Sequence, residues 1–200
     1  MASYKEIISE LLLKTNREGI QEVIENLEKE GFYTAPCSIK FHGNYAGGLV
    51  EHSYNVYKQM VYQKKVQVKI NPELEEKLPD ESIIISALLH DVCKMDNYDL
   101  IDKWRKDSNN KWESYKGYDY SDDSEPLGHG EKSVIKLLLW GLKLTPDEIA
   151  AIRWHMGAFD RSDYGDSKRG LDKAFDKYPL ALLLHVSDML ASRFNDKKKE

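Results

Sequence analysis

Two carboxylates of this 200-residue chain stand where the surrounding sequence is apolar. Asp91 directly follows His90 at the end of the run SIIISALLH, and Asp188 shares a helical face with Leu184 and Ala191. A carboxylate on an apolar face costs free energy unless it is paired or binds a metal. Histidines lie on comparable faces, and imidazole together with carboxylate suits Zn²⁺, Mn²⁺, Fe²⁺ or Co²⁺. The sequence therefore predicts a buried metal site.

Single histidines are weak signals, because one imidazole on an apolar stripe is more often a hydrogen-bonded core residue. His52 lies on an apolar stripe that includes Val56, and His155 shares a face with Ile152. His185 is expected to hydrogen-bond within the core rather than to bind a metal directly. The histidines and acids taken together favour a metal site, since two buried carboxylates also need partners.

A series of helices must position these side chains. Ser3 and Glu6 predict a capping box that opens the first helix, and Thr145 with Glu148 marks another helix start. The segment SIIISALLHDVCK is apolar nearly all round, which is typical of a central buried helix. After the first helix, the expected helical ranges are 17–30, 49–67, 82–94, 130–142, 145–155 and 171–194, followed by a solvated tail at 196–200.

Residues 98–126 have a different composition, which is rich in aromatic and charged side chains. We expect a β-hairpin there, with Ile101–Lys106 paired to Lys111–Tyr115 around a turn at Asn109 and Asn110. The aromatic side chains are expected to pack within the hairpin rather than to stack on nucleic-acid bases. The sequence thus predicts an all-α helical bundle with a small β-hairpin insertion at about residues 98–126.

The composition describes a water-soluble protein, since 41% of the residues are apolar and 32% are charged. A net charge of −5 argues against long nucleic acid as a partner but leaves short RNA or DNA open. Cys37 and Cys93 are too few for a disulfide framework, and no apolar stretch is long enough to span a bilayer. We therefore expect a cytoplasmic protein without a membrane partner.

The order of the motifs resembles that of the HD-domain phosphohydrolases. The similar segments are GGLVEHS (His52), LLHDVCK (His90, Asp91 and Lys94), GHGEKS (His129), RWHMG (His155) and VSDMLASR (Asp188). The run YAGGLVEHS is especially similar to the HD domain of bacterial 3′-to-5′ exoribonucleases. The resemblance covers about residues 40–195, the expected metal-binding core of a single HD-type domain, 1–200, whose N-terminal helices occupy 1–31. The chain shows no separate nucleic-acid-binding domain, which argues against processive RNA degradation.

The resemblance implies a ligand set for one divalent metal ion. These ligands would be His52, His90, Asp91 and Asp188. Asp91 could also bridge to a second ion held by His129 and His155, although members of the family with one metal exist. The ion would be Mn, Fe, Ni, Co, Zn or Mg. It would polarise a phosphoryl oxygen and activate water near neutral pH.

Two further residues are assigned to the substrate. Lys94 follows His90 by four residues and can reach a phosphate as a point charge, so we assign it to substrate binding and, with Asp91, to catalysis. His42 is expected to contact the substrate or to act as an acid. The expected reaction is hydrolysis of a phosphomonoester or phosphodiester, in a nucleotide or short oligonucleotide. A non-catalytic nucleotide-binding module with the same fold is the alternative, and the complete ligand set with Lys94 favours the enzyme.

Overall fold

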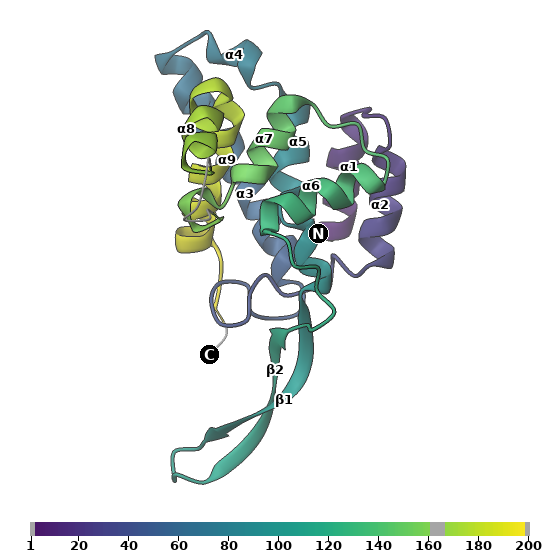
Figure 1. The fold of residues 1–200 in the computed structure, drawn as a ribbon, viewed down its shortest axis with the longest axis vertical. Coiled ribbons are helices and arrows are strands. Elements are labelled where there is room, and N and C mark those ends of the chain that lie inside the picture. Colours follow the sequence, from purple (N-terminus) through teal and green to yellow (C-terminus); the bar gives the residue numbers. More distant parts are fainter. Residues whose placement is uncertain (1–2, 161–166, 199–200) are drawn as a thin grey trace.

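The computed structural model describes residues 3–160 and 167–198, which form a bundle of helices from which one β-hairpin projects (Figure 1). The helices are α1 (Tyr4–Lys14), α2 (Ile20–Lys29), α3 (Gly48–Ile70), α4 (Leu74–Lys77), α5 (Asp80–Leu89), α6 (His129–Leu139), α7 (Pro146–Trp154), α8 (Ser167–Lys177) and α9 (Pro179–Leu190). The 3₁₀ turns η1 (Val92–Asp96) and η2 (Gly157–Asp160) and the π-helical turn η3 (Ala191–Asn195) complete the helical part. The predicted mostly helical fold with a small β insertion is confirmed.

Helix α5 is the centre of the bundle, as its apolar composition predicted. Eight of its ten residues are buried, because other helices pack on every side of it. Its residues Ile85 and Leu88 belong to a core that also contains Ile8 of α1. Ile83 instead packs in a second core with Leu184 of α9. Within the part of the chain that the structure describes, no helix has the length and apolar character needed to cross a bilayer.

Helix α5 ends at Leu89, so the expectation of a continuous helix over 82–94 is wrong. The chain leaves the α-helix at His90 and Asp91 and continues as η1. The Nδ1 atom of His90 lies 2.9 Å from the carbonyl oxygen of Ala87, one of the carbonyls that a helix end leaves without a backbone partner. The imidazole therefore caps its own helix, and the next residue, Asp91, is placed at the helix end.

The expected last helix, 171–194, is in fact two helices and a π-helical turn. Pro179 lacks a backbone N–H, and its ring disfavours the α conformation for the preceding residue. Tyr178 accordingly adopts an extended conformation (φ −123°, ψ 92°), which separates α8 from α9. The chain also forms the short helix α4 in the connector between Pro72 and Pro79, where we expected none.

The hairpin is longer than the sequence predicted. Strands β1 (Tyr98–Lys106) and β2 (Trp112–Tyr120) pair antiparallel, from Tyr98 opposite Tyr120 to Lys106 opposite Trp112. The turn is stabilised by Asp107, whose Oδ1 accepts hydrogen bonds from two backbone N–H groups of the loop. Asn110 adopts a left-handed conformation there (φ 62°), which asparagine tolerates better than most residues.

A buried ion pair joins the N-terminal helices to the rest of the bundle. Arg17 donates two hydrogen bonds, of 2.7 and 2.9 Å, to the Glu148 carboxylate in α7. Ser82 Oγ donates a third, of 2.7 Å, and Glu148 is fully buried. The capping box predicted at Ser3 is confirmed, and the helix start predicted at Thr145 is also a capping box. Glu148 is therefore both a capping residue and the partner of Arg17.

We expect Arg17→Ala to lower the free energy of unfolding by about 3 kcal/mol, because it leaves a carboxylate buried and uncompensated. Lys143→Ala is the matched control, because Lys143 forms an ion pair with Glu18 between the same two regions of the chain. Both of these side chains are 74% exposed, so their ion pair should contribute little to stability. Urea denaturation followed by circular dichroism measures both values. Equal losses in the two variants would contradict the assignment.

Candidate metal centre

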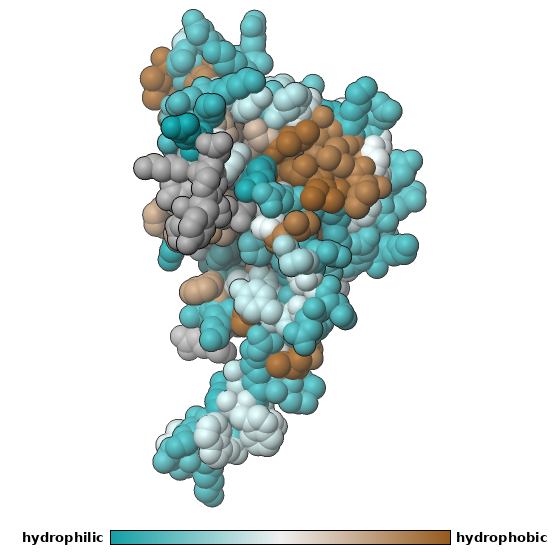
Figure 2. All heavy atoms as spheres, viewed as in Figure 1, coloured by the Kyte–Doolittle hydropathy of each residue, from teal (hydrophilic) through white to brown (hydrophobic). Residues whose placement is uncertain are grey.

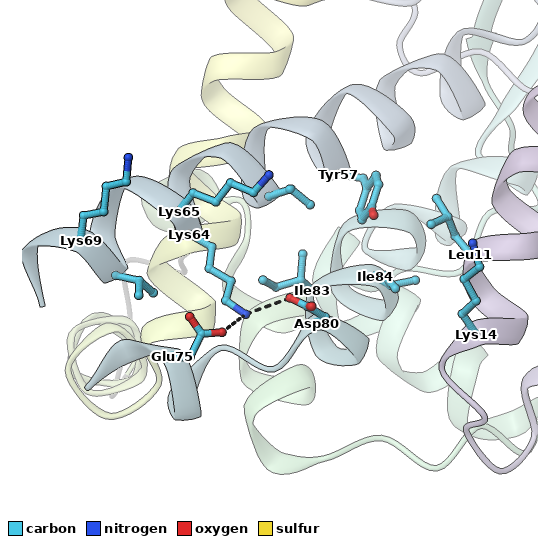
Figure 3. A pocket seen from close by; sticks show the side chains of 12 residues that line it. Leu11, Lys14, Tyr57, Lys64, Lys65, Lys69, Glu75, Asp80, Ile83 and Ile84 are labelled. Carbon is cyan, nitrogen blue, oxygen red and sulfur yellow. Dashed lines mark hydrogen bonds and ion pairs between the residues drawn. The ribbon is translucent and has the colours of Figure 1, made fainter. Parts of the chain in front are cut away.

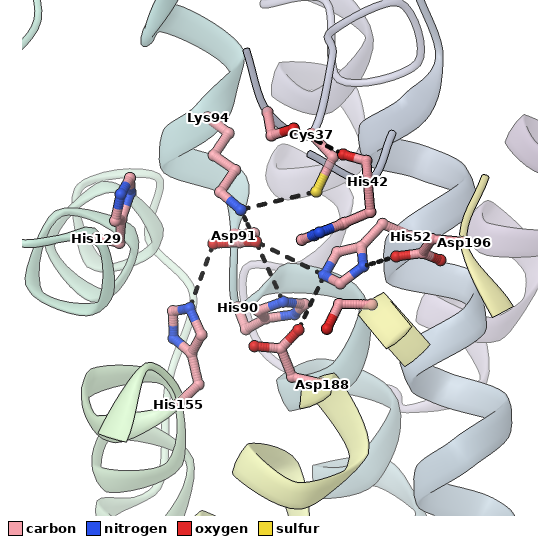
Figure 4. A network of polar contacts seen from close by, with 12 residues as sticks. Cys37, His42, His52, His90, Asp91, Lys94, His129, His155, Asp188 and Asp196 are labelled. Carbon is pink, nitrogen blue, oxygen red and sulfur yellow. Dashed lines mark hydrogen bonds and ion pairs between the residues drawn. The ribbon is translucent and has the colours of Figure 1, made fainter. Parts of the chain in front are cut away.

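The ends of several helices converge on one buried cluster of histidine and aspartate side chains (Figure 4). Asp91 Oδ2 lies 3.3 Å from His90 Nε2, and Asp91 Oδ1 lies 3.3 Å from His155 Nε2. His52 Nε2, from α3, lies 3.8 Å from Asp91 Oδ2 and 3.3 Å from Oδ1 of Asp188 in α9. The structure therefore brings these five predicted residues together.

Two of these histidines have the same local geometry. His90 follows α5 and His155 follows α7, and the Nδ1 atom of each lies within 2.9 Å of the carbonyl oxygen three residues earlier, in Ala87 and Ile152. A carbonyl oxygen can only accept, so each Nδ1 must donate its hydrogen. In the neutral ring the Nε2 atom then carries a lone pair, and in both residues it is the atom next to Asp91.

The cluster contains more buried acceptors than donors. The Nε2 atoms of His52, His90 and His155 and the Oδ1 atom of Asp91 are buried and have no aligned hydrogen bond, while Asp91 Oδ2 is paired with the Lys94 ammonium. Their lone pairs face one another, which is unfavourable unless a cation lies among them. The ligand atoms of His90, Asp91 and His155 all lie within 4.8 Å of one another, and so do those of His52, His90 and Asp188. This donor set fits a divalent transition metal.

Lys94 is buried beside Asp91 on the 3₁₀ turn η1 instead of extending an α-helix. Its Nζ lies 2.6 Å from Asp91 Oδ2 and 3.7 Å from Cys37 Sγ. Burial lowers the pKa of Lys94, but the neighbouring Asp91 carboxylate has the opposite effect and holds this pKa well above its usual value. Burial raises the pKa of Asp91, but Lys94 and His90 lower it to well below its usual value. The site therefore holds an ammonium and a carboxylate in direct contact.

Asp196, which we expected in a solvated tail, is part of the site. Its Oδ2 lies 2.7 Å from His52 Nδ1, and its Oδ1 accepts a 2.7 Å hydrogen bond from Asn55. Burial lowers the pKa of His52, but Cys37, Asp188 and Asp196 together raise it well above its usual value. A carboxylate on Nδ1 of a histidine directs Nε2 toward a metal, a common arrangement around bound ions.

The segment 195–197 is fastened along α3 and the loop before it. Asn195 Oδ1 accepts a 2.8 Å hydrogen bond from Gln59, and the carbonyl oxygen of Lys197 accepts one of 2.8 Å from the backbone of Gly43. The turn η3 positions Asp196 next to His52, because the Asp196 N–H donates a hydrogen bond to the carbonyl oxygen of Ala191 and closes the turn. The sequence offers no signal for this contact, because Asp196 begins a charged run typical of a free tail.

We expect Asp196→Ala to weaken metal binding by about 10- to 100-fold, because His52 loses the partner that orients its ring. Asn195→Ala is the matched control, as it removes the neighbouring contact to Gln59 and leaves His52 Nδ1 paired. Competition with a chelator of known affinity measures both constants. Wild-type affinity in Asp196→Ala would show that the carboxylate does not orient the imidazole.

His129 is the first residue of α6 and lies apart from the other imidazoles in Figure 4. Its Nδ1 lies 3.7 Å from Cys93 Sγ. Among the described residues, none of the three groupings of possible metal ligands includes His129. Its role as a ligand of a second ion stays a prediction.

His42 faces the cluster from the loop that precedes α3. Its ring centroid lies 4.9 Å from that of His52, and the two form a third ligand grouping with Cys37. Burial, together with the neighbouring His52 and Lys94, lowers the pKa of His42 to about 4. His42 is thus neutral at neutral pH, a state suited to hydrogen bonding with a substrate rather than to protonating it.

His185 supports His155 from behind the cluster. Its Nδ1 donates a 2.6 Å hydrogen bond to the His155 carbonyl oxygen, and its ring stacks on Phe175 with the centroids 5.4 Å apart. Gly157 makes room for this ring, since a Cβ at that position would lie 2.6 Å from His185 Cε1. The core role expected for His185 agrees with these contacts.

A separate cavity of about 710 Å³ lies among α1, α3, α4 and α5 (Figure 3). Its buried lysine, Lys64, lies 2.8 Å from an Asp80 oxygen and 2.9 Å from a Glu75 oxygen, so its charge is already offset. None of the histidines of the cluster lines it. The cavity therefore offers neither the donor set nor the unpaired groups found at Asp91.

The chain is similar to one curated enzyme over part of its length. It is 40% identical over 68 residues to the dihydroneopterin 2′,3′-cyclic phosphate phosphodiesterase of Methanocaldococcus jannaschii. This match spans 32% of the chain and 24% of that relative. No protein-family profile and no solved structure matches the chain. The similarity supports a phosphohydrolase, and the HD-domain assignment stays a prediction.

Proposed function

We propose that this chain is a metal-dependent phosphohydrolase of the HD-domain type that cleaves a phosphodiester in a nucleotide-like substrate. The observation that carries the proposal is the set of buried imidazole Nε2 atoms that lie around Asp91 without an aligned hydrogen bond. A divalent cation is the group that would satisfy them together. The similarity to an enzyme named for a cyclic phosphate diester supports the same reaction class.

In this proposal His52, His90, Asp91 and Asp188 hold a divalent ion, with His155 beside Asp91. When bound, such an ion polarises a phosphoryl oxygen and lowers the pKa of water. Figure 4 shows the side chains pointing toward one another from α3, from α9 and from the residues that directly follow α5, so the helical bundle holds them more rigidly than long loops would.

The remaining polar groups of the site act on the substrate. Lys94 presents an ammonium next to Asp91, so a phosphoryl group drawn to the centre meets a positive charge. This charge stabilises the negative charge that builds up on the phosphoryl oxygens during hydrolysis. Neutral His42, beside His52, donates or accepts a hydrogen bond at the substrate. We also infer that 40–195, extended by Asp196, is the metal-binding core of one domain, and that the Arg17–Glu148 ion pair fastens the N-terminal helices to it.

The test is a screen of the purified protein loaded with Mn²⁺, Fe²⁺, Ni²⁺ or Co²⁺. The substrates are 2′,3′-cyclic nucleotides, nucleoside monophosphates and bis(p-nitrophenyl) phosphate. We expect turnover of the diesters that requires the metal and disappears in Asp91→Ala. Metal-dependent nucleotide binding without turnover of any of these substrates would instead identify a non-catalytic binding module.

A further inference from the structure

The hairpin leaves both of its faces uncovered. The hairpin extends away from the helical body, and β1 contacts η1 at the end of the hairpin that joins this body (Figure 1). Most residues of both strands are exposed. A two-stranded hairpin is marginally stable in water by itself, and a sheet normally buries one face against another layer. The hairpin, which projects from the body as an arm, therefore has a face without the second layer that a sheet normally packs against.

One face of the hairpin is aromatic. Side chains directly opposite each other in an antiparallel pair lie on the same face, and alternate residues share it. The resulting aromatic face carries Tyr98, Leu100, Trp104, Trp112, Tyr118 and Tyr120, together with the Asp102–Lys116 ion pair, Lys106 and Ser114. Trp104 and Trp112 are each 65% exposed, and Tyr120 is 68% exposed. Exposed apolar surface of this extent typically marks an interaction site.

The charges of the hairpin are largely neutralised within it. The ion pairs are Lys103–Asp119 at 2.9 Å, Arg105–Glu113 at 2.7 Å and Lys116–Asp102 at 3.0 Å. A surface that binds single-stranded nucleic acid combines its aromatic side chains with a continuous run of free positive charge. Pairing removes most of that charge here, and Lys106 of the aromatic face lies over the Trp112 ring, 5.6 Å from its centroid. The aromatic face therefore fits an apolar partner better than a polyanion.

A second apolar surface lies on the helical body. Ile135, Leu138 and Leu139 of α6 form this α6 patch and are 44%, 47% and 82% exposed. Figure 2 shows a broad hydrophobic area over α6 on the helical body, above the projecting hairpin. The α6 side chain Lys136 is also neutralised internally, by ion pairs to Glu30 at 2.7 Å and Asp96 at 3.0 Å.

We propose that the aromatic face of one copy packs on the α6 patch of a second copy, in a two-fold symmetric dimer. In such a dimer the two-fold axis makes the two contacts equivalent, so that each copy covers the other's patch. The three exposed aromatic rings offer about 400 Å². With the α6 patch each copy would contribute roughly 700 Å², close to the ~800 Å² per partner of a standard interface.

The test is sedimentation of the full chain at several concentrations. We expect the wild type, whose chain mass is 23.2 kDa, to sediment as a dimer. The double variant Trp104→Ser/Trp112→Ser and the single variant Leu139→Glu should both sediment as monomers. Tyr62→Ser, which changes a 62% exposed tyrosine of α3 outside both surfaces, is the control and should remain dimeric. Circular dichroism checks that each variant is folded.

Mixing the two monomeric variants tests the arrangement itself. The double variant keeps its α6 patch and Leu139→Glu keeps its aromatic face, so one of the two contacts can form and a weak one-to-one complex should appear. A monomeric wild type overturns the proposal. A dimeric Leu139→Glu beside a monomeric double variant also overturns it, because the arms would then pair with each other. Quenching of tryptophan fluorescence by a short single-stranded RNA, with a monomeric wild type, would assign the aromatic face to nucleic acid.

Discussion

Asp91→Ala is expected to abolish stoichiometric metal binding and, with it, phosphodiester hydrolysis. Each oxygen of Asp91 lies 3.3 Å from an imidazole Nε2 atom, and Oδ2 is also paired with the Lys94 ammonium. Removing this carboxylate therefore takes away the anionic ligand at the middle of the cluster. Added metal at about 100 times its dissociation constant should stabilise the wild-type fold by about 2.7 kcal/mol, and this gain should vanish in the variant.

The control for this experiment is Asp96→Ala. Asp96 also lies on the stretch after α5, but it is half exposed and pairs with Lys136 at the surface. Elemental analysis after dialysis gives the metal content, and thermal denaturation with and without added metal gives the stabilisation. Equal metal content in Asp91→Ala and wild type would show that the cluster is not the binding site. Loss of metal in both variants would point to a general effect on folding.

The cluster was predictable where a polar residue interrupts an apolar pattern. Asp91 and Asp188 stand among aliphatic residues, and a buried charge needs a partner whatever the tertiary structure around it. Asp196 lacks that signal, because lysines follow it and its partner His52 is 144 residues away in sequence. Only the π-helical turn after α9 brings it back to α3. The local sequence does not specify such a long-range contact.

The helices were predicted best where their ends have chemical markers. Ser3 and Thr145 are followed three residues later by Glu6 and Glu148, and each pair forms a capping box where a helix start was expected. The interruption between α8 and α9 at Pro179 also follows from local chemistry. One continuous helix was predicted there because the residues after Pro179 have a strong apolar periodicity. The hairpin was predicted too short, because cross-strand pairs such as Tyr98 with Tyr120 extend the strands beyond the expected Ile101–Lys106 and Lys111–Tyr115.

Lys94→Met is expected to lower kcat/KM by about 10²- to 10³-fold, the scale of losing one preorganised stabilising group. Methionine keeps much of the apolar bulk of the side chain and removes the charge. Lys94 donates no ligand atom to a cation, so we expect the metal content of the loaded protein to be unchanged. Steady-state kinetics with a cyclic nucleotide, together with elemental analysis, separates the two effects.

Lys64→Met is the matched control, because Lys64 is as buried as Lys94 and also lies beside a carboxylate, 2.8 Å from Asp80. It lines the cavity of Figure 3 rather than the histidine cluster, so its loss should affect stability and leave kcat/KM close to wild type. Equal losses of kcat/KM in the two variants would mean that a buried lysine matters only for the fold. Loss of metal from Lys94→Met would mean that the ammonium holds Asp91 in place for the ion, and its role would then be positional.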